Sequence, residues 1–360
     1  MKAENEGYEE SVNRIRVMGV YLTKATELLG RSSLDLGERN ALSLYISELD
    51  DYYTSENWKL DLNLDELGKL PDDLKRGVLS EDGIFNLLER YKERFEEDGS
   101  RKMKQYIVDA FTDKPFSGNP AAVCVMESWP SEKFMKDLAM ENNLSETAYI
   151  VKEEQGYHLR WFTPGSEVEL CGHATLASAF VILNFIEPDK DIVKFNTLSG
   201  ELKVTRHDNL LTMDFPTYEQ KEIPVTDDME SAFGVHPVKA VLGPDLVCVF
   251  DSEEKIRSMN PDQQKLAALP GRGQNVTALG KESDCVSRSF FPKLLVAEDP
   301  VCGSAHCQIA SYWAKELNKT KIHAYQASRR GGHLYCEILD NARIAISGKA
   351  ALVAVSDIVV

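Results

Sequence analysis

The chain has 360 residues, of which 43% are hydrophobic and 28% charged, and its formal net charge is −17. This length suits two or three domains with a sizeable core. No apolar run reaches the roughly 18–20 residues of a membrane span, the N-terminus lacks the layout of a secretory signal, and no basic block offers a nucleic-acid site. We therefore predict a cytoplasmic protein that binds neither membrane nor nucleic acid.

The first part of the chain, residues 1–102, differs in composition from the rest. It contains no cysteine or histidine, and all seven residues of each type lie beyond it. Hydrophobic residues recur every three or four positions within 8–29, 42–53 and 84–95, which predicts amphipathic helices. Without histidine or cysteine, this part of the chain has few side chains suited to acid–base or nucleophilic catalysis at neutral pH. We predict a small helical bundle with a structural or interaction role, with a partner-binding groove as the alternative.

We place this helical domain at 1–98 and a charged, flexible linker at 99–103. The domain resembles a small bacterial domain family of unknown function. The resemblance covers most of 8–98 and rests on the segments Asp51–Trp58, Gly68–Pro71, Asp73–Asp82 and Asn86–Leu88. It implies no activity, and it leaves open what the domain contacts.

Beyond residue 103, short apolar runs separated by glycine and proline predict strands. The predicted strands are 104–109, 121–126, 147–152, 157–162, 192–196, 201–206 and 210–215, and the predicted helices are 131–141, 173–185 and 305–317. Cys171-Gly172-His173-Ala174 recurs later as Cys302-Gly303-Ser304-Ala305, each before an apolar helix. We interpret this repeat as two related α+β halves, 104–215 and 216–360, of which the last strands can return to the first half. Two unrelated glycine-capped helix starts are the alternative.

The repeated helix starts suggest what kind of ligand the halves bind. A helix N-terminus leaves about four N–H groups unpaired and carries about half a positive charge, and glycine lets a ligand approach closely. Two such ends across a cleft would hold a small carboxylate and stabilise a carbanion conjugated with it. We therefore expect a proton-transfer site for a small acid. We expect no phosphate cradle, since no GxxxxGK[ST] phosphate loop occurs.

Residues 104–360 resemble the phenazine-biosynthesis PhzF-like isomerase family, within the diaminopimelate-epimerase-like superfamily. The matching segments are Val108–Thr112, Pro115–Val123, Asn143–Tyr149, Arg160–Pro164, Glu169–Ala177, Ser287–Phe291, Glu298–His306 and Gln326–Arg329 with Gly331-Gly332. The resemblance implies an α+β fold of two halves, each a mixed sheet around a central helix. It also implies a homodimer and a cofactor-independent isomerase of a small carboxylic acid. Involvement in phenazine production does not follow from it.

The resemblance implies that Glu146 moves the proton. A carboxyl next to an apolar strand should be desolvated, which favours a group that both accepts and returns a proton; a capping or turn glutamate is the alternative. By the same resemblance His173, Asp299 and Ser304 line the site, and we expect His173 to be neutral at its helix start. The backbone N–H groups of Gly172, Gly303 and Ser304 would bind the carboxylate. Asn119 either reaches the cleft or only holds a Gly-Asn-Pro turn.

Three alternatives stay open at this point. Cys171 and Cys302 occupy mirrored helix starts, where thiol pKa values fall, so they could form a two-base racemase or epimerase pair. Cys171 with His173, or Cys302 with His306 and Cys307, supplies zinc-type ligands, but the spacing is unusual and we expect no metal. A non-catalytic small-acid binding protein is the third alternative. Residues 235–249 are expected to set the choice of substrate.

Overall fold

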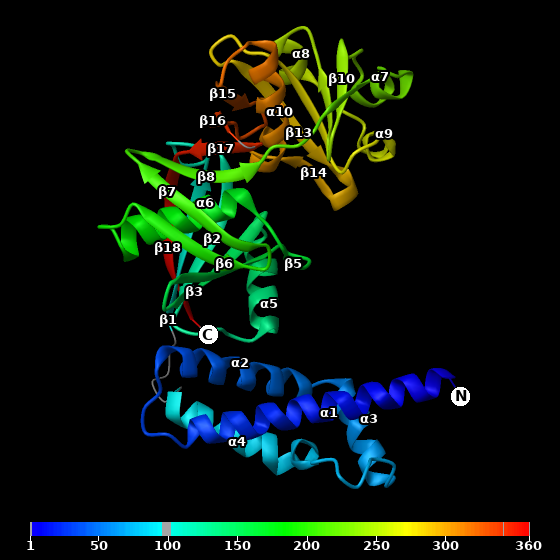
Figure 1. The fold of residues 1–360 in the computed structure, drawn as a ribbon, viewed down its shortest axis with the longest axis vertical. Helices are drawn as coiled ribbons and strands as arrows, with labels where there is room; N and C mark the ends of the chain where they lie inside the picture. The colour runs from blue at the N-terminus through cyan, green and yellow to red at the C-terminus, as the bar shows by residue number, and fades with distance from the viewer. Residues whose placement is uncertain (1, 96–101, 341, 360) are drawn as a thin grey trace.

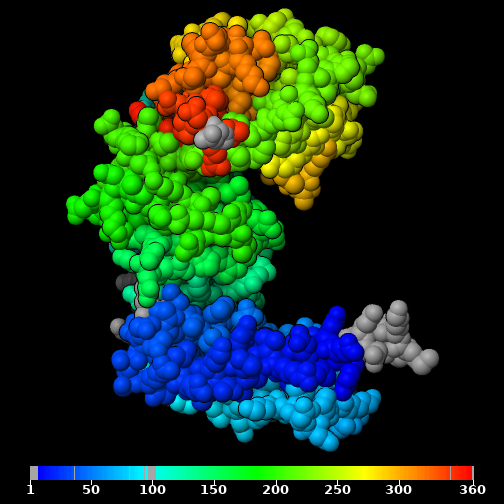
Figure 2. Space-filling view, viewed as in Figure 1, coloured from blue at the N-terminus to red at the C-terminus, as the bar shows by residue number. Residues whose placement is uncertain are grey.

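The computed structural model describes residues 2–95, 102–340 and 342–359. Figure 1 shows an N-terminal helical bundle, a first α/β half next to it and a second half at the far end. In Figure 2 the bundle and the second half both project beyond the first half on the same side, so the outline is C-shaped. Of the predicted linker, residues 99–101 lie outside the described residues, and 102–103 begin the first strand.

The bundle consists of α1 (Lys2–Leu29), α2 (Leu36–Tyr53), α3 (Glu56–Glu66), a 3-10 turn (Gly77–Leu79) and α4 (Glu81–Phe95). The predicted stripes at 8–29, 42–53 and 84–95 lie on α1, α2 and α4 and supply most of one hydrophobic core. The sequence did not predict α3, because this helix buries only Trp58 and Asp61 and so has no apolar stripe.

Asp61 is a completely buried carboxylate inside the bundle. Arg14 on α1 donates to it from Nε and Nη2 at 2.9 and 2.7 Å, and the Tyr52 hydroxyl on α2 donates at 2.8 Å. Because Asp61 itself lies on α3, this network ties three helices together at a point where an unpaired charge would be costly.

The first half wraps a sheet around α6 (Gly172–Val181), which continues as a π-helical turn (Ile182–Ile186). Its strands are β1 (Lys102–Ala110), β2 (Asn119–Met126), β3 (Glu146–Glu153), β4 (Gly156–Phe162), β5 (Glu167–Val168), β6 (Ile192–Thr197), β7 (Gly200–His207), β8 (Leu210–Pro216) and β18 (Ala350–Val359). Every residue from His173 to Ala179 is buried, as expected for a helix that is apolar on all sides. The outer helix α5 (Glu132–Asn142) starts at the N-cap Ser131.

The second half repeats this plan around α10 (Gly303–Glu316). Its strands are β9 (Lys221–Ile223), β10 (Lys239–Leu242), β11 (Leu246–Val249), β12 (Gln274–Leu279), β13 (Cys285–Phe291), β14 (Val296–Asp299), β15 (Lys321–Gln326), β16 (Gly332–Leu339) and β17 (Arg343–Gly348). Its outer face carries α7 (Asp227–Phe233), α8 (Glu253–Ser258) and α9 (Gln263–Ala268), and a 3-10 turn (Pro292–Leu294) precedes β14. The sequence did not predict these short helices, which are too short for a periodic pattern.

The two halves are joined by strand pairing and by a shared core. β17 of the second half pairs antiparallel with β8 of the first, and β18 then returns to pair antiparallel with β1. One hydrophobic core contains buried residues of both α6 and α10, and these two helices contact each other. The expected fold class, a duplicated α+β fold preceded by a helical domain, is confirmed.

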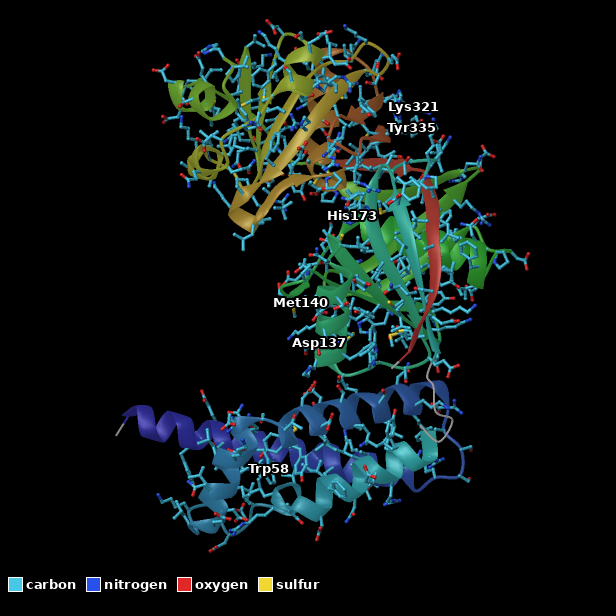
Figure 3. All side chains as sticks on the ribbon, turned by 180° about the vertical axis from the view of Figure 1, so that it is seen from behind. Trp58, Asp137, Met140, His173, Lys321 and Tyr335 are labelled. Atoms are coloured by element: carbon cyan, nitrogen blue, oxygen red, sulfur yellow. The ribbon has the colours of Figure 1, made fainter. Side chains whose placement is uncertain are left out.

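The helical bundle lies against the first half. The Ser43 hydroxyl on α2 donates a hydrogen bond to the carbonyl oxygen of Trp129, just before α5. Asp51 on α2 shares a hollow with α5, on which Figure 3 labels Asp137 and Met140. Among the described residues, no helix has the length and apolar character needed to cross a membrane.

Candidate active site

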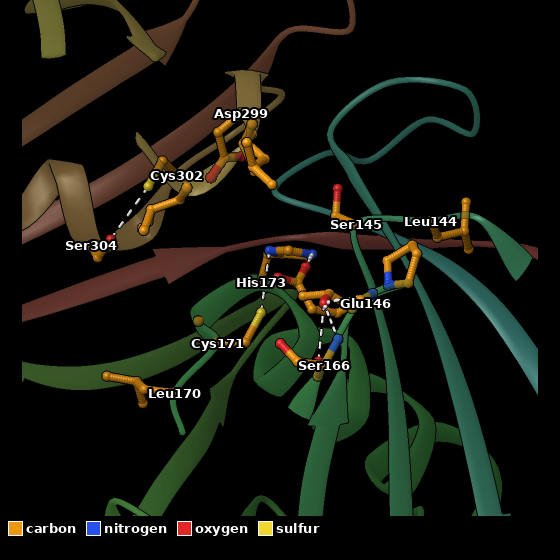
Figure 4. A pocket seen from close by; sticks show the side chains of 18 of the residues that line it. Leu144, Ser145, Glu146, Ser166, Leu170, Cys171, His173, Asp299, Cys302 and Ser304 are labelled. Atoms are coloured by element: carbon orange, nitrogen blue, oxygen red, sulfur yellow. Dashed lines mark hydrogen bonds and ion pairs between the residues drawn. The ribbon is translucent and has the colours of Figure 1, made fainter. Parts of the chain in front are cut away.

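A cavity of about 690 Å³ lies between the two halves. Figure 3 shows His173 at this junction, and Figure 4 shows the cavity from close by. The first half lines it with residues 143–146, 163–166 and 170–173 and with Phe215; the second half lines it with Arg272, residues 294–296, Asp299 and residues 302–304. Both repeated helix starts therefore face the same cavity, as the sequence predicted.

Glu146 and His173 meet at the first-half side of the cavity. Side chains alternate along a strand, so Glu146 at the start of β3 lies on the same face as Ala148 and Ile150, which pack in the core around α6. His173 is the second residue of α6, and its Nε2 lies 3.0 Å from Oε2 of Glu146. The Glu146 side chain is only 17% exposed, which agrees with the expected desolvation.

The contact between these two side chains is electrostatic and leaves hydrogen-bonding capacity unused. Nε2 of His173 and Oε2 of Glu146 are both buried, and neither has a hydrogen-bond partner with good geometry. Buried polar atoms without partners are uncommon and call for an explanation. An explanation consistent with their position in the cavity wall is that a bound molecule completes their hydrogen bonding.

The other ring nitrogen of His173 faces Cys171, with Sγ 3.5 Å from Nδ1 (Figure 4). Burial opposes a charge on His173, but the Cys171 sulfur and the Glu146 carboxylate outweigh it and hold the pKa of the imidazole well above its usual value. This direction is opposite to the neutral histidine expected from the helix start alone. The reason is that a carboxylate at 3.0 Å acts more strongly than the partial charge of a helix end.

Asp299, at the end of β14, faces the cavity from the second half. Asn119 donates from Nδ2 to Oδ1 of Asp299 at 2.8 Å and to the carbonyl oxygen of Val301 at 3.0 Å. Burial raises the pKa of the Asp299 carboxyl. Asn119 has no exposed surface and is not among the residues that line the cavity, so its amide ties β2 of the first half to the second instead of facing a substrate.

The start of α10 is held by two buried side chains. Gln326 accepts from the backbone N–H of Cys302 at 2.9 Å and donates to the carbonyl oxygen of Asp299 at 2.6 Å. His306 contacts the Cys302 carbonyl oxygen through Nδ1 at 2.7 Å and the Ser287 hydroxyl through Nε2 at 3.1 Å. These contacts fix the turn that presents Gly303 and Ser304 to the cavity.

The two cysteines of the repeat are not activated thiols in this environment. Burial and the charge of Glu146 raise the pKa of Cys171, and burial and the charge of Asp299 raise the pKa of Cys302 well above its usual value. Both directions are opposite to the lowering expected from a helix N-terminus, because desolvation and a neighbouring carboxylate disfavour the thiolate.

One group of zinc-type ligands is found among the described residues. Single ligand atoms of Glu146, Cys171 and His173 lie within 4.8 Å of one another. The second predicted set does not join them, because both ring nitrogens of His306 are engaged by Cys302 and Ser287. Our expectation that the site holds no metal therefore remains a prediction.

The sequence did not reveal one charged residue of the cavity, Arg272. Residues 235–249, which we expected to set the choice of substrate and all of which the structure describes, do not line the cavity. One of them, Asp245, contributes through Arg272, because its carboxylate accepts two hydrogen bonds from the Arg272 guanidinium. A sequence signal did exist, because Arg272 lies between Gly271 and Gly273, and such a pair indicates a backbone in close contact with its surroundings.

Comparisons with known proteins show what the two parts of the chain are similar to. A family model described as phenazine biosynthesis-like protein matches residues 108–356, and a model for a domain of unknown function (DUF4298) matches residues 15–97. An uncharacterized isomerase of Pseudomonas aeruginosa is 46% identical over 70% of this chain and 97% of its own length. An uncharacterized isomerase of Halalkalibacterium halodurans is 41% identical over the same shares. A crystal structure of a PhzF family protein from Enterococcus faecalis is 48% identical over 71% of this chain and 99% of that chain, with a TM-score of 0.70.

Proposed function

The chain belongs to the phenazine biosynthesis-like protein family, and we propose that it is an isomerase that moves a proton between two carbons of a small carboxylic acid. Glu146 is the acid–base group of this proposal, and the reaction needs no organic cofactor or metal. The observation that carries the proposal is the pair of unpartnered buried atoms, Oε2 of Glu146 and Nε2 of His173, in the wall of the cavity.

In the first step Glu146 takes a proton from a carbon of the substrate. The C–H bond breaks, an O–H bond forms on the carboxyl, and the electron pair spreads from that carbon toward the conjugated carboxylate of the substrate. Backbone N–H groups at the starts of α6 and α10 stabilise this developing charge. In the second step Glu146 returns the proton to a different carbon, so that no proton is gained or lost overall.

His173 and Asp299 support this transfer from the two sides of the cavity. A protonated imidazole 3.0 Å from Glu146 balances the charge of the carboxylate and hydrogen-bonds the substrate. Asp299, whose pKa is raised by burial, accepts or shares a hydrogen bond with a polar group of the substrate, such as an amine. A homodimer is the family expectation, which light scattering on the purified chain tests.

Proton–deuterium exchange tests the proposed reaction directly. Small unsaturated acids are incubated with the protein in D₂O, and incorporation of deuterium is followed by mass spectrometry. We expect exchange with the wild type, loss with Glu146→Gln, and normal exchange with Glu153→Gln, which changes the same residue type at the other end of β3. Exchange should also survive treatment with EDTA.

Two outcomes would replace the proposal with one of the alternatives. If no acid that binds undergoes exchange, the chain is a binding protein and not an isomerase. If Cys171→Ser and Cys302→Ser abolish exchange while Glu146→Gln does not, the reaction uses the two-cysteine route.

A further inference from the structure

Arg272 is the one arginine or lysine among the described residues that line the cavity. Its side chain is 49% exposed, so the guanidinium reaches the open space between the halves. It belongs to the second half, whereas Glu146 and His173 belong to the first. A positive group opposite the acid–base pair is placed to receive the negative end of a molecule that spans the cavity.

One edge of the guanidinium is fixed by Asp245. Nε and Nη2 donate to the two carboxylate oxygens of Asp245, each at 3.1 Å, and the Asp245 side chain is only 1% exposed. Asp245 also accepts from the backbone N–H of Gly273 at 3.0 Å. A buried carboxylate with this many donors does not move easily, so it sets the direction in which the arginine points.

The backbone around Arg272 is equally constrained. Gly271 has a φ of +83°, and a Cβ there would lie 2.6 Å from the backbone nitrogen of Leu246. A Cβ on Gly273 would lie 2.2 Å from the ring of Phe291, which the Arg272 guanidinium also overlies at 5.6 Å. The two glycines thus allow a close approach that no other residue permits. The arginine is held ready for binding before any ligand arrives.

The opposite edge of the guanidinium is left for a ligand. Nη1 makes no hydrogen bond to a described residue. Besides its bond to Asp245, Nη2 makes only a long one, 3.5 Å, to the Ser304 hydroxyl at the first turn of α10. A free pair of N–H groups in one plane matches the two oxygens of a carboxylate. Ser304 lies next to this edge and can add a further hydrogen bond.

We infer that Arg272 binds the carboxylate of the substrate through Nη1 and Nη2, beside Ser304, and so sets the specificity of the site for acids. The inference deepens the proposed function and rests on it for the reacting end of the molecule. The substrate is then an acid whose carboxylate lies at the second half while its reacting carbon lies at Glu146. Its body contacts apolar side chains that line the same cavity, including Leu144, Leu170 and Leu294.

The test compares a carboxylate with an uncharged molecule of the same shape. Binding of benzoate and of benzamide is measured by ligand-observed NMR titration. Because hydrogen bonds to charged groups are among the stronger ones, we expect the wild type to prefer benzoate by about tenfold or more. Arg272→Gln should abolish this preference, and Arg272→Lys should restore only part of it, because lysine lacks the planar fork. Arg343→Gln, at an exposed arginine paired with Asp214, is the matched control and should keep the full preference.

A second measurement needs no variant. Phenylglyoxal modifies exposed arginines, and peptide mass spectrometry reads each site separately. Benzoate should slow the modification of Arg272 and leave that of Arg343 unchanged. The inference is wrong if the wild type does not prefer benzoate, if Arg272→Gln retains the preference, or if benzoate fails to protect Arg272.

The outcome is separable from that of the proposed reaction. Glu146→Gln should lose exchange and still prefer benzoate, whereas Arg272→Gln should lose the preference even in this binding assay. If Glu146→Gln keeps exchange but Arg272 passes both tests, the acid-binding role stands and the proposed acid–base group is wrong.

Discussion

Replacing Asn119 by alanine removes two hydrogen bonds that tie the halves together, those to Asp299 and to the Val301 carbonyl oxygen. Asn119 and Val301 are both completely buried, so no water replaces the lost donor at Val301. Each lost bond is worth about 1 kcal/mol, and an unsatisfied buried acceptor adds about 1–3 kcal/mol. We expect Asn119→Ala to lower the free energy of unfolding by about 3–5 kcal/mol.

Asn142→Ala is the matched control for this prediction. Asn142 also donates two side-chain hydrogen bonds, to Gln105 at 2.9 Å and to Thr147 at 3.0 Å, but both partners lie in the first half. It is only partly buried, so its loss should cost less. Stability is measured by urea unfolding and calorimetry, with separate assignment of the transition of the helical bundle.

The two variants should differ most in activity. Asn119→Ala frees the Asp299 carboxyl to turn, and displacement of a group in an active site by about 1 Å can cost on the order of a hundredfold in rate. Exchange should therefore fall about tenfold or more in Asn119→Ala and stay near the wild-type rate in Asn142→Ala. Equal stability or equal exchange in the two variants would refute the view that Asn119 positions Asp299 across the halves.

Three further predictions concern buried polar groups. Burial lowers the pKa of His306 to about 4 from 6.5. The folded protein should therefore lose stability as the pH falls from 6.5 toward 4, by about 3 kcal/mol in total. Unfolding curves at several pH values check this, and the same pH dependence in the wild type and in His306→Gln would mean that another group is responsible. All seven cysteines are buried and free, so iodoacetamide should label them slowly at neutral pH and rapidly in urea, and fast labelling of the native chain would contradict this. Asp61→Ala leaves Arg14 and Tyr52 without their buried partner and should destabilise the helical bundle by about 3 kcal/mol. The loss is not larger because Arg14 keeps some access to water. In calorimetry, only the unfolding transition of the bundle should shift.

The sequence predicted the elements that a periodic pattern defines. The stripes of the helical bundle, the strands from 104 to 215 and the two repeated helix starts all lie where the pattern placed them. Glu146 and His173 were named through the family resemblance, and the structure brings their side chains to 3.0 Å. Each of the two residues lies at the start of an element, β3 or α6, that the sequence pattern alone identifies.

The remaining features depend on contacts between distant segments. Asp245 fixes the orientation of the Arg272 side chain, and Arg272 faces a cavity that neither half forms alone. The pKa values of His173 and Cys171 reverse the direction expected from their helix position. Burial, with the Glu146 carboxylate from β3, raises the pKa of Cys171, and the Cys171 sulfur together with Glu146 raises the pKa of His173. Asn119 was expected at a turn or in the cleft and instead bridges the halves, since only the tertiary fold shows that Asp299 lies within its reach.

The pairing of β18 with β1 also constrains how the protein is made. A ribosome delivers β1 soon after the helical bundle, but its neighbour β18 follows only after the whole second half. Until then one edge of β1 has no strand to pair with, and such edges invite association with other chains. The bundle can fold early, because its hydrophobic core consists of its own residues alone. It rests against the first half before the final strand of that half is made. Synthesis of β18 after the second half, rather than synthesis of residues 104–215 alone, is then the event that closes the sheet around α6.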